Sequence, residues 1–174
     1  MAPVTASPSS PAGEPGPSGA PDRELRAEAV VAAPPARVWA LLTDVAQMPA
    51  RSPELLRMVP LKRGGLRVGQ WYLGLNRRGP AVWPTRNVVD ELVPGRVLAW
   101  TTTSSGARWI WELSPAGPEG RATRVVHRRP VPRRLTVVSR VFAPLALGGS
   151  AGHADELEQG MAQTVERLKV AAEG

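Results

Sequence analysis

The chain has 174 residues, contains no cysteine and carries a formal net charge of +7. This length fits one domain with a tail, and the lack of cysteine excludes disulfides and thiolate chemistry. The arginines are scattered, with local pairs at Arg77-Arg78, Arg128-Arg129 and Arg133-Arg134, whereas nucleic-acid-binding proteins usually concentrate their charge in one stripe. We therefore interpret the charge as a basic solvated surface and expect no nucleic-acid partner.

The N-terminal segment carries no targeting signal that we can identify. Its first 21 residues lack the basic start and apolar run of a signal peptide. No part of the chain approaches the ~20 apolar residues that a membrane span needs, so we expect a soluble, cytoplasmic protein with no stable membrane insertion. Residues 1–21 are mostly Pro, Ser, Gly and Ala, a composition that cannot offset its ordering entropy. We predict a disordered tail over 1–21 and a folded domain over 22–174.

The folded part is predicted to open with a strand and two short helices. Apolar and charged residues alternate over residues 24–33, which is typical of a half-buried strand. Pro34-Pro35 ends this strand, and an apolar stripe at helical spacing then predicts the first helix, with Val38, Leu41, Leu42 and Val45 on it and Trp39 beside it. Ser52-Pro53-Glu54 resembles a helix start, with Ser as the N-cap. We expect a second helix there, with Leu55, Leu56 and Val59 on its apolar side.

The middle of the chain indicates an antiparallel meander. Short segments rich in Trp, Val, Thr and Ile alternate with turn-forming residues, a spacing typical of consecutive antiparallel strands. The expected turns are Gly64-Gly65, Asn76 to Pro80, Pro94-Gly95, Ser104 to Gly106 and Pro115 to Gly120. The expected strands are Trp71 to Leu75, Val82 to Leu92, Val97 to Thr103, Ala107 to Leu113 and Ala122 to Arg128.

The end of the chain predicts a long amphipathic helix. Its apolar stripe has a period of 3.6 and consists of Leu157, Met161, Val165, Leu168 and Ala172. The apolar and basic segment from Arg133 to Leu147, with Pro144 inside it, precedes a glycine pair. Three interpretations stay open for it: the first part of the same helix, a mobile lid, or a patch that touches an anionic membrane.

These elements predict an α+β domain with a helix-grip fold. A curved antiparallel sheet of about seven strands wraps on the long C-terminal helix, and two short helices follow the first strand. Because a curved sheet cannot pack flat along one helix, we expect a cavity between them.

Four stretches resemble the polyketide cyclase/dehydrase and lipid-transport group of the START-like (SRPBCC) superfamily. Residues 30–44 are similar to the family's "P-x-x-V-W-x-x-L-x-D" after a strand, and residues 48–54 to its "W-S-P-E", with Arg51 where many relatives carry Trp. Residues 89–100 resemble "V-x-x-x-x-P-G-x-x-L-x-W", and residues 156–169 the terminal grip helix. The resemblance implies the helix-grip fold over about residues 23–172. Because members bind lipids, quinones, hormones or polyketides, and some are cyclases or hydrolases, it implies no single chemistry.

Tryptophan provides the first candidate site residues. The chain has six Trp against one Phe and one Tyr. Aromatic walls would give a cavity an apolar lining with polar handles at the indole N–H groups, although some of these residues can equally fill the core. The expected ligand-binding tryptophans are Trp71, Trp83, Trp100, Trp109 and Trp111.

Polar residues on the expected strands could orient a ligand from the same face. We place Asn76, Arg86 and His127 in the candidate site and note Asn87 as a further inward residue, although His127 could instead be exposed beside its arginines. Imidazole suits acid–base work near neutral pH. We treat His153 as a loop residue. With no cysteine and two distant histidines, we expect no metal site and no cofactor.

The carboxylates of the sheet do not suggest a catalytic pair. Adjacent strand residues face opposite ways, so Asp90 and Glu91 are expected on opposite faces. Glu112 is expected opposite the Trp109/Trp111 face, in a surface ion pair. The sequence contains no Ser-His-Asp set, phosphate-binding loop or dinucleotide fingerprint.

Three functions remain open. The leading hypothesis is a module that binds a small hydrophobic molecule (a lipid, quinone or polyketide-like compound) between the sheet and the C-terminal helix. The second is a polyketide aromatase/cyclase or dehydratase, with protons donated from Arg86, His127 or a water. The third is a protein or ribosome partner that uses the basic surface. The sequence predicts no particular oligomeric state.

Overall fold

The computed structural model of the protein describes residues 23–131 and 150–174. The predicted disordered tail over 1–21 and the segment from Arg133 to Leu147 lie outside these residues. In chain order the elements are β1 (Leu25–Val31), α1 (Pro35–Thr43), η1 (Val45–Gln47), α2 (Met48–Arg51), β2 (Leu55–Pro60), β3 (Trp71–Arg78), β4 (Ala81–Val93), β5 (Val97–Thr102), β6 (Ala107–Ala116), η2 (Pro118–Gly120), β7 (Ala122–Arg129) and α4 (Ser150–Glu173).

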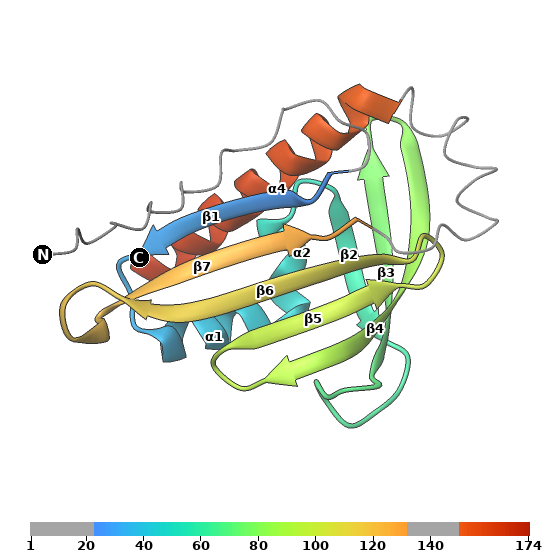
Figure 1. Cartoon of the computed structure of the whole chain (residues 1–174). Helices are drawn as coiled ribbons and strands as arrows, with labels where there is room; N and C mark the ends of the chain where they lie inside the picture. The colour runs from blue at the N-terminus through green and yellow to red at the C-terminus, as the bar shows by residue number, and fades with distance from the viewer. Residues whose placement is uncertain (1–22, 132–149) are drawn as a thin grey trace, which may run out of the picture.

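The seven strands form one antiparallel sheet in the order β1-β7-β6-β5-β4-β3-β2. The sheet curls around α4, and α1 and α2 cover the same face (Figure 1). We call this the inner face. The predicted α+β helix-grip fold is therefore confirmed, with β1 and β2 as the two edge strands.

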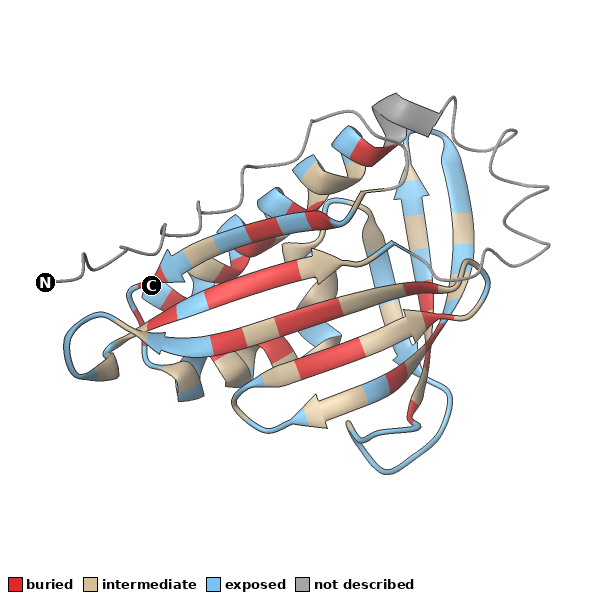
Figure 2. Ribbon diagram, viewed as in Figure 1, coloured by how far each residue is buried: buried red, intermediate tan, exposed pale blue. Residues whose placement is uncertain are grey.

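The core lies between the inner face and the helices. Its largest fully buried apolar side chains come from strands and helices alike: Leu25, Val31, Val38, Leu98, Val125 and Leu168. Burial alternates with exposure along most of β1 (Figure 2), because successive strand residues point to opposite faces. In β7 the consecutive residues Val125, Val126 and His127 are all buried. Burying these side chains against α1 and α4 supplies the main favourable free energy of folding.

The second predicted helix is wrong in position. Helix α2 ends at Arg51, and the residues expected to form a helix are strand β2. The Ser52 Oγ does accept hydrogen bonds from the backbone N–H groups of Glu54 (3.3 Å) and Leu55 (3.1 Å), so the local capping signal is real. The chain then continues extended because it pairs with β3 at the edge of the sheet.

Two other local expectations are also corrected. Strand β3 runs through Asn76 to Arg78, so the hairpin turn contracts to Gly79-Pro80. His153 falls within α4 rather than in a loop, because the helix begins at Ser150, directly after the glycine pair.

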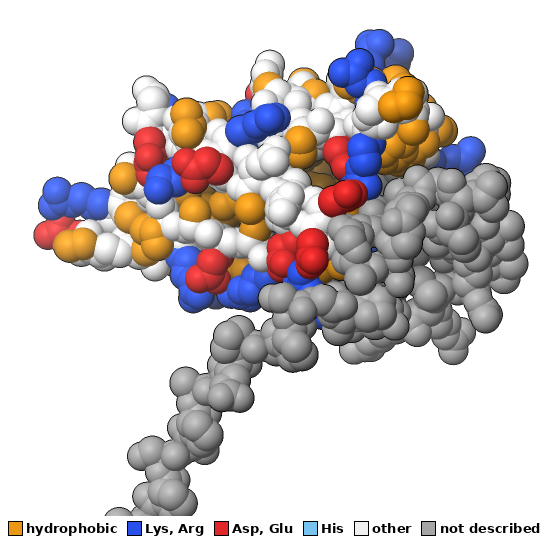
Figure 3. Space-filling view, turned by 90° about the horizontal axis from the view of Figure 1, so that it is seen from above, with side chains coloured by type: hydrophobic (Ala, Val, Ile, Leu, Met, Phe, Trp, Pro, Cys, Tyr) orange, Lys and Arg blue, Asp and Glu red, His pale blue; other side chains and the backbone are white. Residues whose placement is uncertain are grey.

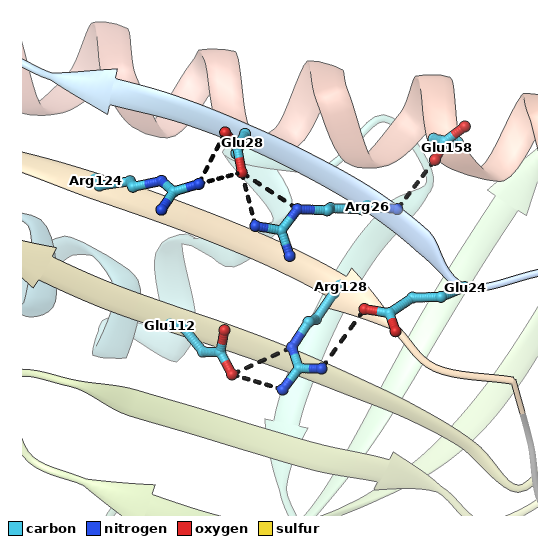
Figure 4. Close-up of polar contacts among 7 residues, drawn as sticks. All are labelled: Glu24, Arg26, Glu28, Glu112, Arg124, Arg128 and Glu158. Atoms are coloured by element: carbon cyan, nitrogen blue, oxygen red, sulfur yellow. Dashed lines mark hydrogen bonds and ion pairs between the residues drawn. The ribbon is translucent and has the colours of Figure 1, made fainter. Parts of the chain in front are cut away.

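The outer face of the sheet carries a network of ion pairs. Arg128 binds Glu112 at 2.7 Å, which is the surface pair expected for Glu112, and Arg124 binds Glu28 at 3.0 Å (Figure 4). Arg108 binds both Asp90 (3.2 Å) and Glu91 (2.7 Å). The expectation that these two carboxylates face opposite ways is wrong, because a β-bulge at Asp90 interrupts the alternation between Val89 and Glu91.

Candidate functional site

Four aromatic rings lie together on the inner face of β5, β6 and β7. The imidazole of His127 stacks on the indole of Trp111 with ring centroids 3.8 Å apart and an interplanar angle of 9°. Trp109 lies 5.9 Å from the same imidazole, tilted by 36°, and Trp100 pairs across the strands with Trp109. We call Trp100, Trp109, Trp111 and His127 the aromatic shelf. Trp111 and His127 are buried, whereas Trp100 and Trp109 are half-buried. The rings of the latter two are therefore the part of the shelf that a planar or aliphatic molecule can cover first.

The shelf holds polar atoms that find no partner. The Trp111 Nε1 and both ring nitrogens of His127 are buried without a hydrogen-bond partner. Each such group costs roughly 1–3 kcal/mol relative to a satisfied one, and buried orphans of this kind often mark a site for a ligand or water. Burial lowers the pKa of His127 to about 3. The imidazole is therefore neutral at physiological pH, with one nitrogen able to donate and the other able to accept.

A row of hydrogen-bonded side chains extends the site across the neighbouring strands. The Thr102 hydroxyl donates to Asn87 Oδ1 at 2.7 Å, and Asn87 Nδ2 donates to Thr85 Oγ1 at 3.2 Å. Asn76 Nδ2 also donates to Thr85 Oγ1, at 3.0 Å. We call Asn76, Thr85, Asn87 and Thr102 the polar row. Trp109 Nε1 donates to Thr102 Oγ1 at 3.3 Å, which joins this row to the shelf.

A small apolar hollow adjoins the shelf. It has a volume of about 10 Å³ and is lined by Val45, Met48, Met58, Leu66, Tyr72, Val89, Leu98 and Trp100. A hollow of this size holds about one water. A larger ligand can therefore enter only if lining side chains move, and the flexible thioethers of Met48 and Met58 are suited to such movement.

Six of the eight predicted site residues lie on the inner face. Trp100, Trp109, Trp111 and His127 form the shelf, and Asn76 belongs to the polar row. Trp83 pairs with Asn76 at the far end of the β3–β4 hairpin, half-buried and away from the shelf.

Trp71 and Arg86 lie on the outer face. Successive strand residues point to opposite faces. Trp71 precedes the inward, buried Tyr72, and Arg86 precedes the inward, buried Asn87, so both Trp71 and Arg86 point outward. Around them the outer face of β2, β3 and β4 exposes Val59, Leu75 and Val82 among arginines. In Figure 3, hydrophobic and basic side chains gather at the upper right of the coloured surface. Because they lie on the outer face, Trp71 and Arg86 cannot contact a ligand on the shelf.

The sequence analysis missed Thr85, Thr102 and Arg129 on the inner face. Each lies two residues from an inward residue that was considered: Thr85 from Asn87, Thr102 from Trp100, and Arg129 from His127. The alternation of strands was therefore the available signal. Alternation identifies these residues only once the inward face of each strand is known, and the sequence left that face open.

An antiparallel sheet curved around one long C-terminal helix is the fold of START-like proteins, and here its inner face carries aromatic and polar side chains. Residues 22–173 match the family described as polyketide cyclase / dehydrase and lipid transport, and the chain belongs to this family. A search among curated proteins finds none that matches.

Three solved structures of similar fold align over most of this chain. The KanY protein aligns with a TM-score of 0.64 at 18% identity, covering 88% of this chain and 99% of its own. The Zhui aromatase/cyclase from Streptomyces sp. R1128 aligns at 0.62 and 21% identity, covering 87% and 93%. The di-domain ARO/CYC StfQ from the steffimycin biosynthetic pathway aligns at 0.63 and 17% identity, covering 87% of this chain and 51% of that one. At these identities the likeness shows the fold alone.

Two further features bear on possible partners. Within the described residues, no helix is both long and apolar enough to cross a bilayer. The same residues contain no cluster of three or more His, Cys, Asp or Glu side chains suited to a metal ion.

Proposed function

We propose that the protein binds a small hydrophobic molecule, a lipid, quinone or polyketide-like compound, between the inner face of the sheet and α4. The observation that carries this proposal is the aromatic shelf, where the indole N–H of Trp111 and the ring nitrogens of His127 are buried without partners. A ligand with an apolar body and an oxygen atom would cover the rings and satisfy these atoms. Family membership supports the same class of ligand.

The energetics are adequate for such binding. Burying ~250 Å² of apolar ligand surface at about 25 cal/mol/Å² contributes roughly 6 kcal/mol before ordering costs. The hollow beside Trp100 must enlarge first. Rearranging Met48 and Met58 costs less than rearranging branched side chains would, because methionine has several accessible rotamers.

Native mass spectrometry of the protein purified from its own host tests the proposal, followed by extraction of any bound compound. A co-purifying lipid, quinone or aromatic species is the expected result. In parallel, the neutral dye Nile red is titrated into wild type, Trp109→Leu and the matched control Trp71→Leu, which alters the outer face. We expect Trp109→Leu to weaken dye binding at least about tenfold and Trp71→Leu to leave it unchanged. An empty protein that binds no dye, or equal effects of both substitutions, would refute the proposal.

The second candidate function is a polyketide aromatase/cyclase acting on a bound chain. The position of His127 favours it, because the imidazole lies on the shelf with both nitrogens unpartnered and able to hydrogen-bond a bound chain. With a pKa of about 3, this group would orient the chain as a neutral donor or acceptor and would not carry a proton near neutral pH. Arg86, the other predicted proton donor, lies on the outer face and takes no part. The names of two structural neighbours point the same way. Cyclisation of a linear poly-β-ketone thioester by wild type, lost in His127→Phe and retained in Trp71→Leu, would favour the enzyme over the binding module.

A further inference from the structure

Arg129 is an inner-face cation placed beside the aromatic shelf. It follows His127 by two residues on β7 and lies opposite Leu25 of β1. Its guanidinium carbon lies 5.5 Å from the centroid of the Trp109 ring, within the range of a cation–π contact. The charge is thus held over one end of the shelf, on the same face as the proposed ligand.

The neighbouring arginines of β7 are paired with carboxylates, whereas Arg129 has no such pair among the residues that the structure describes. Arg128 binds Glu112 and Arg124 binds Glu28 on the outer face (Figure 4). Over residues 23–131 and 150–174, no carboxylate lies within ion-pairing distance of Arg129, and its Nε is buried without an acceptor. Outside the described residues the chain has two carboxylates, Glu14 and Asp22, and the segment 132–149 that follows Arg129 has none.

Within the described part of the chain, the half-buried guanidinium of Arg129 therefore has no counter-ion, which is an unfavourable arrangement in a folded protein. Desolvation lowers the pKa of Arg129, but arginine keeps its proton in proteins, so the charge persists. Buried charges are normally paired. A guanidinium presents parallel N–H donors that match the two oxygens of a carboxylate.

We propose that Arg129 binds the carboxylate of the ligand, so that the protein selects hydrophobic acids over neutral molecules of the same shape. The apolar body then lies along the aromatic shelf, and the acid group meets the guanidinium over Trp109. This inference rests on the proposed function, because it names the chemical class of the molecule that occupies the same face.

The test compares an acid with its alcohol. Dissociation constants for dodecanoic acid and dodecan-1-ol are measured at pH 7.5 by displacement of Nile red from the full chain. Wild type is expected to bind the acid at least about tenfold more tightly, as a charge-assisted hydrogen bond implies. Arg129→Gln should bind both compounds within about twofold of each other, with the alcohol affinity unchanged, and Arg129→Lys should keep part of the preference.

The matched control is Arg128→Gln, which removes an arginine from the adjacent position on the outer face and should retain the full preference for the acid. Equal affinity of wild type for acid and alcohol would overturn this inference while leaving the binding function intact. Loss of the preference in Arg128→Gln as well would also overturn it, because the effect would then come from general surface charge. If neither compound nor the dye binds, the binding function itself is wrong and the inference falls with it.

Discussion

The imidazole of His127 lies flat on the indole of Trp111, with the ring centroids 3.8 Å apart. The two residues are direct cross-strand partners on β7 and β6, so the sheet register itself fixes the stack. The same register buries the imidazole with neither nitrogen hydrogen-bonded. One pairing therefore explains both the apolar surface of the site and its unsatisfied polar atoms.

Burial of His127 predicts a specific pH dependence of stability. Its pKa falls from 6.5 to about 3 on folding, so between these values the unfolded chain binds a proton that the native state excludes. Its contribution to stability is complete above pH 6.5 and declines as the pH falls toward 3. We expect wild type to lose ~2 kcal/mol of unfolding free energy from this group between pH 7.5 and 5, at about 1.4 kcal/mol per pH unit below 6.5.

Urea denaturation at the two pH values, performed on wild type and His127→Phe, measures this loss. The variant keeps an aromatic ring on Trp111 but has no titrating group. Between pH 7.5 and 5 its unfolding free energy should therefore fall by ~2 kcal/mol less than that of wild type. His153 is present in both proteins, and its contribution cancels. Equal losses in both would show that His127 titrates normally and is accessible to solvent.

The hydrogen bond from Thr102 to Asn87 is expected to be the strongest link in the polar row. Both residues are buried, and the bond is 2.7 Å long. Thr102→Val preserves shape but leaves Asn87 Oδ1 and Trp109 Nε1 without the hydroxyl, so unfolding free energy should fall by about 1–3 kcal/mol. Thr101→Val is the control, because its hydroxyl bonds Asp90 on the exposed outer face, where the change should cost less than about 1 kcal/mol. A larger loss for Thr101→Val would contradict this ranking.

Two glycine-to-alanine substitutions should change stability with opposite signs. A Cβ at Gly74 would lie 2.7 Å from Thr85 Oγ1, an atom that Asn76 and Asn87 hold by hydrogen bonds. We expect Gly74→Ala to destabilise by about 1–3 kcal/mol, because the β-branched Thr85 cannot easily move.

Gly160 lies inside α4, where a Cβ would meet only Pro53 Cγ at an ordinary 3.6 Å. Gly160→Ala should stabilise by about 0.5–1 kcal/mol through the better helix propensity of alanine. Thermal or chemical unfolding of the two variants provides the comparison. Equal signs would show that the packing around Gly74 relaxes more freely than its contacts imply.

Glu158 connects α4 to the edge strand β1. It accepts hydrogen bonds from Arg23 (2.7 and 2.9 Å) and from the backbone N–H of Arg26 (3.0 Å), and the Arg23 guanidinium lowers its pKa. Glu158→Gln should cost about 1–2 kcal/mol at pH 7. Because the pKa is lowered on folding, this difference should shrink as the pH falls below the unfolded value of about 4.3.

The control for Glu158 is Glu166→Gln on the same helix. Glu166 is exposed and, within the described residues, has no ion-pair partner, so we expect a change below about 0.5 kcal/mol. Denaturation at pH 7 and pH 3.5 distinguishes the two variants. Similar losses for both would mean that the contact with Arg23 adds nothing beyond general surface charge.

Local patterns in the sequence were enough to predict the class of fold and the order of nearly all elements. Alternation marks β1, a 3.6-residue period marks α4, and turn chemistry at Gly79-Pro80 and Pro94-Gly95 separates the strands. These signals are local, because the period of a chain segment reflects which of its own side chains are buried. The pairing of Glu112 with a surface arginine followed from the same alternation.

The position of the second helix, the bulges and the inward face of the sheet could not be predicted, because they depend on contacts between residues far apart in the chain. Residues 55–60 carry helix-like spacing, yet a bulge against β3 turns Leu55 and Met58 to the same face of a strand. A bulge at Asp90 likewise brings Asp90 and Glu91 onto one arginine. The inward face was fixed only by the strand register, which placed Trp71 and Arg86 outside and Arg129 inside. The two faces of a strand are equivalent until another element covers one of them. Here α4 covers one face of the sheet, and the residues on that face become the inward ones.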